Sequence, residues 1–434
     1  MSRAIPEAPD PPRRWRLPGW LDRYRRLPRP VLDFAAGQFL INLIHASQFL
    51  LLNLYLKDTG MDDPAIAALG SHRFVATLFL ALPAGLWLRG RPLRKPLLWG
   101  SFLFPLSALL ALESVRFEIM PLATASFLFM GFANLILNVG SLPMVMRLTR
   151  DDQSSEALSL LFASWAAASV CGGLLSTGLQ AIGSFSIGST RVVLDEHATL
   201  LLLTLTAFAA PIFYRRLPDP AVAPNPSKTW FHIDRADWPV LGRALIPTLC
   251  IATGAGLSIQ FLNLFFSHVH HLGATAYSGW GSLSNVLVFL AGLFVPEVKR
   301  RFGWRGAILG VQGLAVALLI AMGLTELALP AAWALPFALV CFILRQPLMS
   351  MAGPSISELT MSYVGERNRE LMSACSGAIW SGAWWLAART FQLLRTWEIA
   401  YWQVFMATAI LYFAGTLAYI ALIRSVENRQ PAGH

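Results

Sequence analysis

The sequence predicts an all-α membrane protein in which twelve transmembrane helices form two pseudo-symmetric six-helix bundles. Hydrophobic residues make up 55% of the 434-residue chain and charged residues only 13%, which is too apolar for an ordinary soluble domain. The apolar residues gather in runs long enough to cross a bilayer, which takes roughly 20 helical residues. Short motifs of the first half also recur, in the same order, in the second half.

Each of twelve apolar stretches is expected to form one spanning helix. In order they are 33–56, 64–88, 96–113, 119–146, 157–183, 198–214, 240–267, 276–297, 306–326, 331–356, 371–394 and 400–423. The basic residues support this division because short cytoplasmic loops are enriched in Lys and Arg. Most of the 34 Lys and Arg residues fall before the first span, after the last, or in every second loop. We therefore expect a multi-pass protein of the plasma membrane, the inner membrane of a bacterium, with both termini in the cytoplasm.

The net charge of +10 follows mostly from this topology. The basic residues are dispersed over short inner segments, so no nucleic-acid binding is expected. The segment before the first span, 1–32, lacks the apolar region of a cleavable signal peptide. Its mixture of Trp and Arg fits either an interfacial helix in contact with membrane lipid or a disordered basic tail. The four cysteines fall inside spans without CxxC spacing and are expected to be small core residues.

A weak internal repeat relates the two halves of the chain. The Asn-Leu-Tyr run at 53–55 recurs as Asn-Leu-Phe at 263–265, and Ala-Gly-Leu at 84–86 recurs at 291–293, a separation of about 210 residues. Six spans of the same orientation in each half make this a parallel repeat. The predicted domains are a cytoplasmic basic tail (1–32), an N-terminal six-helix bundle (33–214), a cytoplasmic linker (215–239), a C-terminal six-helix bundle (240–424) and a cytoplasmic tail (425–434).

The loop motif that follows the second span of each half resembles that of the major facilitator superfamily. The first copy begins at Gly85 and ends in a basic cluster at Lys95, with Arg89 where the family has an acid; the second begins at Gly292 and keeps an acid at Glu297. The resemblance covers the chain after the tail and implies two bundles rocking around a cavity lined by the first, fourth, seventh and tenth helices. It also implies gate contacts, for which the candidates are Arg89, Glu297, Arg367 and Arg369. The fifth span lacks the Gly-Pro pair of the family's proton antiporters.

Polar side chains recur at helical spacing on the four helices that the resemblance assigns to the cavity. Residues at i, i+3, i+4 and i+7 share one helical face. We predict that these side chains bind substrate, although amides in membrane helices also serve as interhelical hydrogen-bonding groups. The residues are Gln38, Asn42 and His45 in the first span, Asn134 and Asn138 in the fourth, Gln260 and Asn263 in the seventh, and Arg345 and Gln346 in the tenth.

Arg345 is the most informative of these residues. It lies near the middle of the apolar run 335–354, where a charge is costly and requires a partner or a water-filled cavity. A guanidinium is a planar fork of donors suited to carboxylate or phosphate. We predict that Arg345 binds an anionic group of the substrate, against the alternative that it pairs structurally within the protein. No Asp or Glu lies at comparable depth in any apolar segment.

Four other titratable residues are candidates for gating or coupling. His45 is able to carry a coupling proton or to remain a neutral hydrogen-bonding group. Arg73 and His72 either belong to an outer gate or extend to the membrane interface. Asp33 either caps the first span or titrates during transport.

The sequence thus predicts a secondary transporter that moves a small organic solute, anionic or zwitterionic, by rocker-switch alternating access, with a proton or ion as a possible coupling partner. The alternatives are a multidrug-type exporter of amphiphiles and a non-transporting membrane receptor or scaffold. No HExxH, GxSxG or paired aspartates indicate an enzyme. His268, His270 and His271 lack nearby Cys or carboxylate partners, so neither a metal site nor a cofactor is expected. We expect a monomer.

Overall fold

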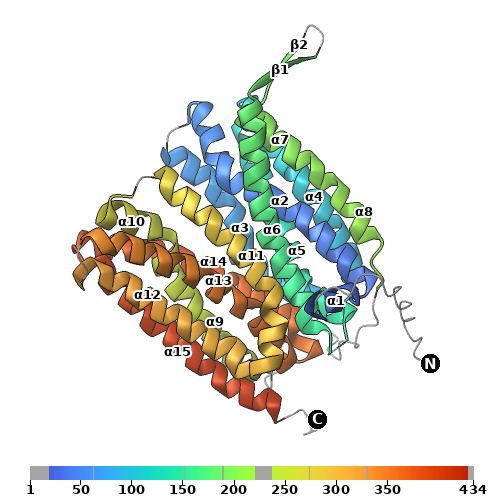
Figure 1. The fold of residues 1–434 in the computed structure, drawn as a ribbon. Helices are drawn as coiled ribbons and strands as arrows, with labels where there is room; N and C mark the ends of the chain where they lie inside the picture. Colours follow the sequence, from blue (N-terminus) through green and yellow to red (C-terminus); the bar gives the residue numbers. More distant parts are fainter. Residues whose placement is uncertain are drawn as a thin grey trace.

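The computed structural model describes residues 19–61, 63–150, 152–187, 190–219, 237–272, 274–328 and 331–428, and these are almost entirely helical (Figure 1). Segment 1–18 of the predicted basic tail and segment 220–236 of the predicted linker lie outside this described part. The division into domains therefore stays a prediction at these boundaries.

The helices of the first half form what we call the N-terminal bundle. Its elements are α2 (Arg29–Asp58), α3 (Asp63–Leu88), α4 (Arg94–Arg116), α5 (Met120–Leu148), α6 (Ser154–Ile182), α7 (Glu196–Thr206), the 3-10 turn η1 (Ala207–Ala209) and α8 (Ala210–Arg215), preceded by the short α1 (Gly19–Arg25). Each of the first six predicted spans falls on one of these helices or on the α7–α8 pair. Their ends differ from the prediction by a few residues.

The second half forms the C-terminal bundle in the same way. Its elements are α9 (Asp237–Ser258), η2 (Ile259–Phe261), α10 (Leu262–His270), α11 (Ala274–Arg305), η3 (Gly306–Gly310), α12 (Val311–Ala328), α13 (Ala331–Val364), η4 (Glu366–Asn368), α14 (Arg369–Thr396) and α15 (Tyr401–Glu427). The seventh predicted span is a broken helix, α9–η2–α10. The tenth, α13, extends beyond its predicted end at residue 356.

Eight helices of the described part are long and apolar enough to cross a membrane, and the chain is an integral multi-pass membrane protein. One of the eight, Gly279–Leu327, has 49 residues. As a straight helix it would extend about 74 Å, more than twice the hydrocarbon thickness of a bilayer. Gly303, with φ +64°, reverses the chain there. A residue without Cβ accepts this backbone conformation readily, and α11 and α12 form separate crossings.

A short β-hairpin between α6 and α7 was not expected from the sequence. Strands β1 (Ser184–Ile187) and β2 (Thr190–Val193) pair antiparallel, with Phe185 opposite Val192. The two strands project beyond the helices (Figure 1). The segment is too short and polar for a span, and only its apolar and polar alternation indicates strands.

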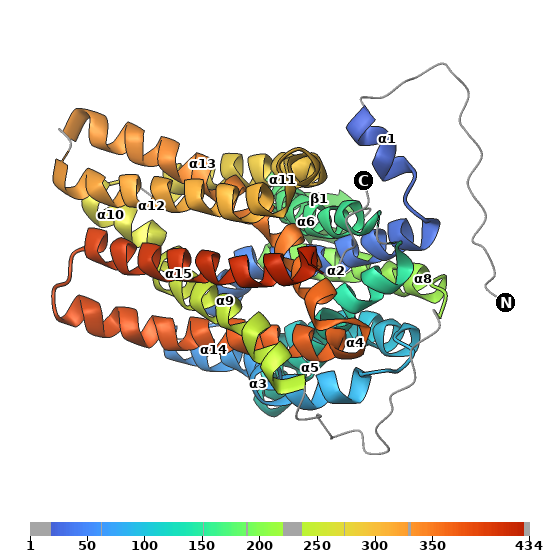
Figure 2. The same cartoon turned by 90° about the horizontal axis from the view of Figure 1, so that it is seen from below.

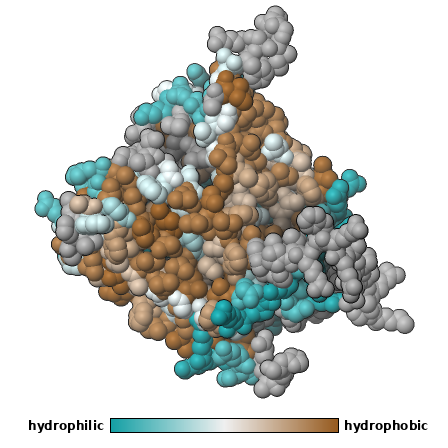
Figure 3. All heavy atoms as spheres, viewed as in Figure 1, coloured by the Kyte–Doolittle hydropathy of each residue, from teal (hydrophilic) through white to brown (hydrophobic). Residues whose placement is uncertain are grey.

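The two bundles meet at one end and diverge towards the other (Figure 1). The basic end, as we call it, carries α1, the end of α15 and the loops around Arg91, Arg215 and Arg300. The hairpin end carries β1, β2 and α10. Viewed from below, the C-terminal bundle occupies one side and most of the N-terminal bundle the other (Figure 2). Apolar side chains form a broad band across the middle of the surface, and hydrophilic side chains gather towards the ends (Figure 3).

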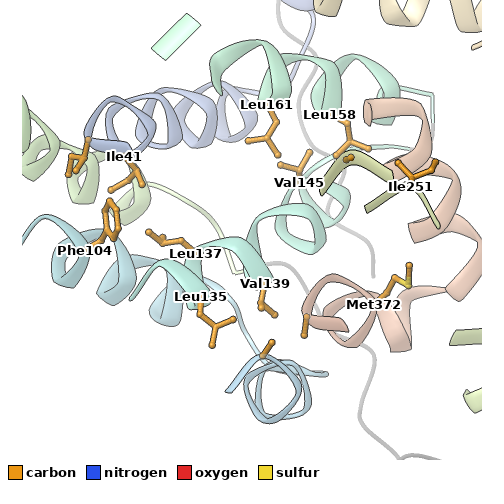
Figure 4. Packing of buried hydrophobic residues seen from close by; sticks show 14 of the residues in the cluster. Ile41, Phe104, Leu135, Leu137, Val139, Val145, Leu158, Leu161, Ile251 and Met372 are labelled. Atoms are coloured by element: carbon orange, nitrogen blue, oxygen red, sulfur yellow. The ribbon is translucent and has the colours of Figure 1, made fainter. Parts of the chain in front are cut away.

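One apolar cluster extends across both bundles. Leu137 and Val145 of α5 and Leu158 of α6 belong to the same buried cluster as Ile251 of α9 and Met372 of α14 (Figure 4). The closest packing between the bundles joins α3 and α5 to α14, and α6 to α11. These helices of the interface position the polar groups described next.

Candidate functional site

Arg89, at the basic end of α3, joins the two bundles. Its side chain is 1% exposed. Nη2 donates to Asp237 Oδ2 at 2.7 Å and to Asn368 Oδ1 at 2.6 Å, and Nε donates to the Arg367 carbonyl at 2.9 Å. Asn368 Nδ2 in turn donates to Asp237 Oδ1 at 3.0 Å. One guanidinium therefore binds the start of α9 and the turn between α13 and α14.

A second ion pair crosses the interface beside Arg89. Arg147, in the last turn of α5, pairs with Glu370 in the first turn of α14, and its Nη1 donates to the Arg91 carbonyl at 2.8 Å. The Glu370 side chain is fully buried. A buried carboxylate requires a paired charge to offset its desolvation, which Arg147 provides from the opposite bundle.

The short helix α1 also connects the bundles. Arg23 pairs with Glu297 of α11 at 2.8 Å and with Glu156 of α6 at 3.8 Å. The Tyr24 hydroxyl donates to the Leu293 carbonyl of α11 at 2.8 Å. Burial raises the pKa of Tyr24, so its phenol remains a neutral donor. The sequence left two interpretations of the N-terminal segment, an interfacial helix and a disordered basic tail. Residues 19–25 form a helix, and this helix makes specific contacts with the protein.

Gly85 permits the close approach of α3 and α14. A Cβ at Gly85 would clash with the Ala374 Cβ and would lie 3.2 Å from the Glu370 carbonyl. We call the Arg89, Arg147, Arg23 and Tyr24 interactions, together with this approach, the basic-end contacts.

A polar cluster occupies the middle of the N-terminal bundle. His45 of α2 lies 3.0 Å from Asn134 Oδ1 of α5, and Asn138 Nδ2 donates to the same oxygen at 2.9 Å. Because an amide oxygen carries no hydrogen, His45 Nε2 is the donor in this arrangement. The sequence predicted that these three residues lie together, and we name them the central cluster.

The central cluster faces the space between the bundles. Asn138 is exposed although it lies well inside α5, and its carbonyl accepts a hydrogen bond from Ser373 of α14 at 3.4 Å. Ser373, Gly377 and Trp380 follow one another on one face of α14, because residues three, four and seven apart share a helical face. The Trp380 side chain is exposed and a Cβ at Gly377 would meet no atom within 4 Å.

Gln346 on α13 and Asn263 on α10, two predicted substrate ligands, differ in their exposure. Gln346 is half-buried and shares one helical face with Gly353, two turns further along α13, where an added Cβ would lie 3.0 Å from Phe162 of α6. Gln346 is therefore on the face of α13 that turns to the N-terminal bundle. Asn263 is exposed, and its Oδ1 accepts from the Leu264 amide. The side chain of Gln260 lies outside the described residues.

Two predicted ligands of α2 are buried. Gln38 accepts a hydrogen bond from the Tyr214 hydroxyl of α8 at 2.7 Å, which directs it into the N-terminal bundle. Asn42, 6% exposed, lies between Gln38 and His45 on the same helix.

Arg73 lies beside the central cluster. The backbone of Arg73 packs directly on Gly131 of α5, one turn from Asn134. Arg73 is near the middle of α3, which extends from Asp63 to Leu88. His72 lies 3.2 Å from the Leu69 carbonyl, through Nδ1.

Arg345 is buried within the C-terminal bundle, with 1% of its surface exposed. Its Nη2 donates to the Tyr412 hydroxyl of α15 at 3.4 Å. The structure thus links Arg345 to α15, while Asn134 bonds to His45. The role of Arg345 as a substrate ligand remains a prediction.

The remaining candidates lie at the basic end. Asp33 is 3.9 Å from Arg216, Glu297 binds Arg23 and Arg300, Arg367 is 3.5 Å from Asp237, and Arg369 Nε is 3.5 Å from the Met361 carbonyl.

Residues of the basic-end contacts that the sequence did not single out include Asp237, which falls in the predicted linker, and Arg23 and Tyr24, whose segment was considered only for its interfacial character. For Arg147 a signal existed, since it is a charged residue at the predicted end of a span. The histidines at 268 and 270 bind Tyr401 and Thr325 at 2.9 and 3.0 Å. The described residues contain no group of three His, Cys, Asp or Glu able to hold a metal.

A comparison with protein families identifies the chain. The sequence model described as Major Facilitator Superfamily matches residues 34–388. The chain belongs to this superfamily. Its members are transporters rather than enzymes, and the prediction of family and fold is confirmed. A search of curated proteins gives no match.

Solved structures share the fold at low sequence identity. A bacterial homologue of the iron transporter ferroportin, in an outward-facing state, is 12% identical with a TM-score of 0.75, and the match covers 91% of this chain and 99% of that one. The transporter FucP, in an outward conformation, is 12% identical with a TM-score of 0.72 over 92% and 98% of the chains. The human organic anion transporter MFSD10 is 14% identical with a TM-score of 0.64 over 94% and 100%.

Proposed function

We propose that this superfamily member is a secondary transporter that moves a small anionic or zwitterionic organic solute by alternating access. The observation that carries the proposal is the central cluster. It presents the amide groups of Asn134 and Asn138 towards the space between the two bundles, where Ser373 of α14 contacts the Asn138 carbonyl. The helices that the family resemblance assigned to the cavity supply it.

The charge at this depth favours an anionic group. Arg73 packs on α5 one turn from Asn134, whereas the described carboxylates of the N-terminal bundle, such as Glu113 and Glu156, lie near helix ends. A guanidinium and two amides provide hydrogen-bond donors suited to a carboxylate. One solved relative of the same fold is described as an organic anion transporter, which agrees with this assignment.

The basic end is the cytoplasmic face in this proposal, because Lys and Arg concentrate on cytoplasmic loops. The basic-end contacts are then the closed cytoplasmic gate, and the structure corresponds to a state open to the outside. Two solved relatives are described in outward states. Inward opening requires Arg89, Arg147 and α1 to release their partners while each bundle moves as a body.

A ligand screen tests the substrate class. Purified protein is heated with anionic, zwitterionic and cationic solutes, since binding to the folded state raises the unfolding temperature. We expect stabilisation by anionic or zwitterionic solutes, and a loss of about tenfold in apparent affinity for Asn138→Ala, as one hydrogen bond to a charged group contributes about 1.5 kcal/mol. Gln38→Ala is the control, because its partner Tyr214 lies inside the bundle. Stabilisation by lipophilic cations alone would instead indicate the multidrug-type exporter.

A second experiment tests His45 as carrier of a coupling proton. The screened solute is loaded into proteoliposomes under an imposed pH gradient. If His45 couples proton and solute, His45→Gln loses accumulation against a gradient but retains exchange of solute across the membrane. Unchanged accumulation in this variant would leave His45 with a hydrogen-bonding role only.

A further inference from the structure

The C-terminal bundle contains a buried positive charge that the transport proposal does not use. Arg345 is 1% exposed, and two of its three guanidinium nitrogens, Nε and Nη1, have no hydrogen-bond partner among the described residues. Its single described hydrogen bond, to the Tyr412 hydroxyl, is long at 3.4 Å, and the guanidinium carbon lies 5.9 Å from the Tyr412 ring centroid. A guanidinium remains charged in proteins, so this charge needs compensation.

A second hydroxyl of α15 is also a donor without a partner among the described residues. Thr408 precedes Tyr412 by one turn of α15, and therefore lies on the same face of that helix. Its hydroxyl is buried and has no hydrogen-bond partner in the described part of the chain. On α13, Phe342 lies one turn before Arg345 and contacts the Tyr277 ring in a tilted arrangement at a centroid distance of 5.7 Å. The surroundings thus combine a cation and hydroxyl donors with apolar walls.

The carboxylates within helices α11, α12, α13 and α15 are bound elsewhere. Glu358 pairs with Lys299 at 2.7 Å and Glu326 accepts from the Trp402 amide at 2.7 Å. Glu297 pairs with Arg23 and Arg300, and Glu427 is 3.5 Å from Arg305. All four lie towards the ends of their helices, whereas Arg345 is near the middle of α13, which extends from Ala331 to Val364.

We propose that Arg345, with the Tyr412 and Thr408 hydroxyls, binds a small monovalent anion of the halide class inside the C-terminal bundle. One negative charge compensates one guanidinium, and the donors Nε, Nη1 and the Thr408 hydroxyl replace the hydration that the anion loses. A doubly charged oxyanion would leave excess charge in an apolar site. The carboxylate of a transported solute has the same charge, but near-complete burial of Arg345 and its bond to α15 favour the free ion.

Chloride titration of the purified full-length protein tests this site. The protein is prepared in gluconate buffer, and chloride replaces gluconate at constant ionic strength while the unfolding temperature is recorded. We expect a saturable rise for the wild type and none for Arg345→Gln. Tyr412→Phe retains the ring and removes one donor, so its half-saturating chloride concentration is expected to rise about tenfold. Binding of radioactive chloride to the same variants gives a readout that does not depend on stability.

Asn134→Ala separates this proposal from the transport proposal. We expect it to weaken stabilisation by organic anions while the chloride response remains that of the wild type. Loss of the chloride response in Asn134→Ala would assign the anion to the central cluster and overturn the site at Arg345. Equal chloride binding in wild type and Arg345→Gln, or no chloride-specific effect in the wild type, would overturn it as well.

Discussion

The two ends of the molecule use their polar side chains differently. At the basic end Arg89, Arg147 and Tyr24 bind residues of the opposite bundle. At the hairpin end the described bonds stay within one bundle. Tyr55 donates to the Leu112 carbonyl, His197 pairs with Glu113, His268 lies 2.9 Å from the Tyr401 hydroxyl, and His270 lies 3.0 Å from the Thr325 hydroxyl.

This difference separates two mechanical roles. Under the proposed alternating access, bonds within a bundle hold its helices together in both states, so each bundle moves as one body. Bonds between the bundles then have to break when the bundles rock, and their free energy sets the balance between the two states. The basic-end contacts are therefore where substitutions change conformation, and the following variants test this from the largest expected effect to the smallest.

Arg89→Gln is expected to have the largest effect. It removes the hydrogen bonds to Asp237 and Asn368, so the carboxylate and the amide each lose a partner. Breaking a buried ion pair in this way lowers the stability by about 3 kcal/mol. We expect a lower unfolding temperature and a basic end that opens more often. Cys375, adjacent to Ala374 at the approach of α3 and α14, is a natural reporter once the other three cysteines are replaced. Its reaction with an impermeant maleimide on the basic-end side of vesicles should accelerate.

A double-mutant cycle shows whether the pair itself is responsible. Combining Arg89→Gln with Asp237→Asn should restore part of the lost stability, because both charges of the buried pair are then removed together and only the half-exposed Arg367 loses its 3.5 Å contact with Asp237. Lys95→Gln, an exposed cation of the same loop, is the matched control and should behave as the wild type. Strictly additive losses in the double variant would show that Arg89 and Asp237 act independently.

Gly85→Ala tests the difference between the basic end and the hairpin end by steric exclusion alone. The added methyl group clashes with Ala374 when the basic end is closed, and overpacking costs about 2 kcal/mol. Labelling of Cys375 should rise by about tenfold or more. Gly70→Ala lies on the same helix towards the hairpin end, where a Cβ meets no atom within 4 Å, and should leave labelling unchanged. Equal effects of the two substitutions would contradict the asymmetry between the ends.

Most of the fold is predictable because bilayer thickness constrains it. A spanning helix must satisfy its backbone internally over a fixed length, so apolar runs and basic loops locate α2 to α15 within a few residues. Interruptions within helices depend on packing. The break at η2 follows Gly256, where a Cβ would lie 2.6 Å from the Ala387 Cβ of α14, a contact that the sequence does not reveal.

The candidate site was less predictable because helical periodicity gives a face but not the neighbour of that face. The spacing of Asn134 and Asn138 placed them on one helical face, and the structure brings both together with His45. The same argument placed Gln38 in the cavity, whereas the structure pairs it with Tyr214. Arg89 binds Asp237, which is far from it along the chain. Such long-range polar pairs depend on how the bundles dock, which local patterns do not encode.

Glu370→Gln should have a smaller effect than Gly85→Ala. The glutamine still hydrogen-bonds Arg147, but the charge-assisted bond is lost, at about 1.5 kcal/mol. We expect faster Cys375 labelling by less than tenfold. Glu366→Gln is the matched control. The Glu366 side chain is 76% exposed and lies 3.9 Å from Arg369, and such an exposed ion pair contributes little to stability. If both substitutions change labelling equally, the burial of Glu370 does not account for the strength of its ion pair with Arg147.

Tyr24→Phe should have the smallest effect of the series. It removes the hydrogen bond from the Tyr24 hydroxyl to the Leu293 carbonyl, a neutral bond that contributes about 1 kcal/mol, and keeps the ring in place. Labelling of Cys375 should rise a few-fold, since α1 then holds α11 through Arg23 alone. Arg26→Gln affects only an exposed pair within α1, to Asp22, and should not change labelling. A response of Arg26→Gln as large as that of Tyr24→Phe would mean that the helicity of α1, rather than its bond to α11, stabilises the closed basic end.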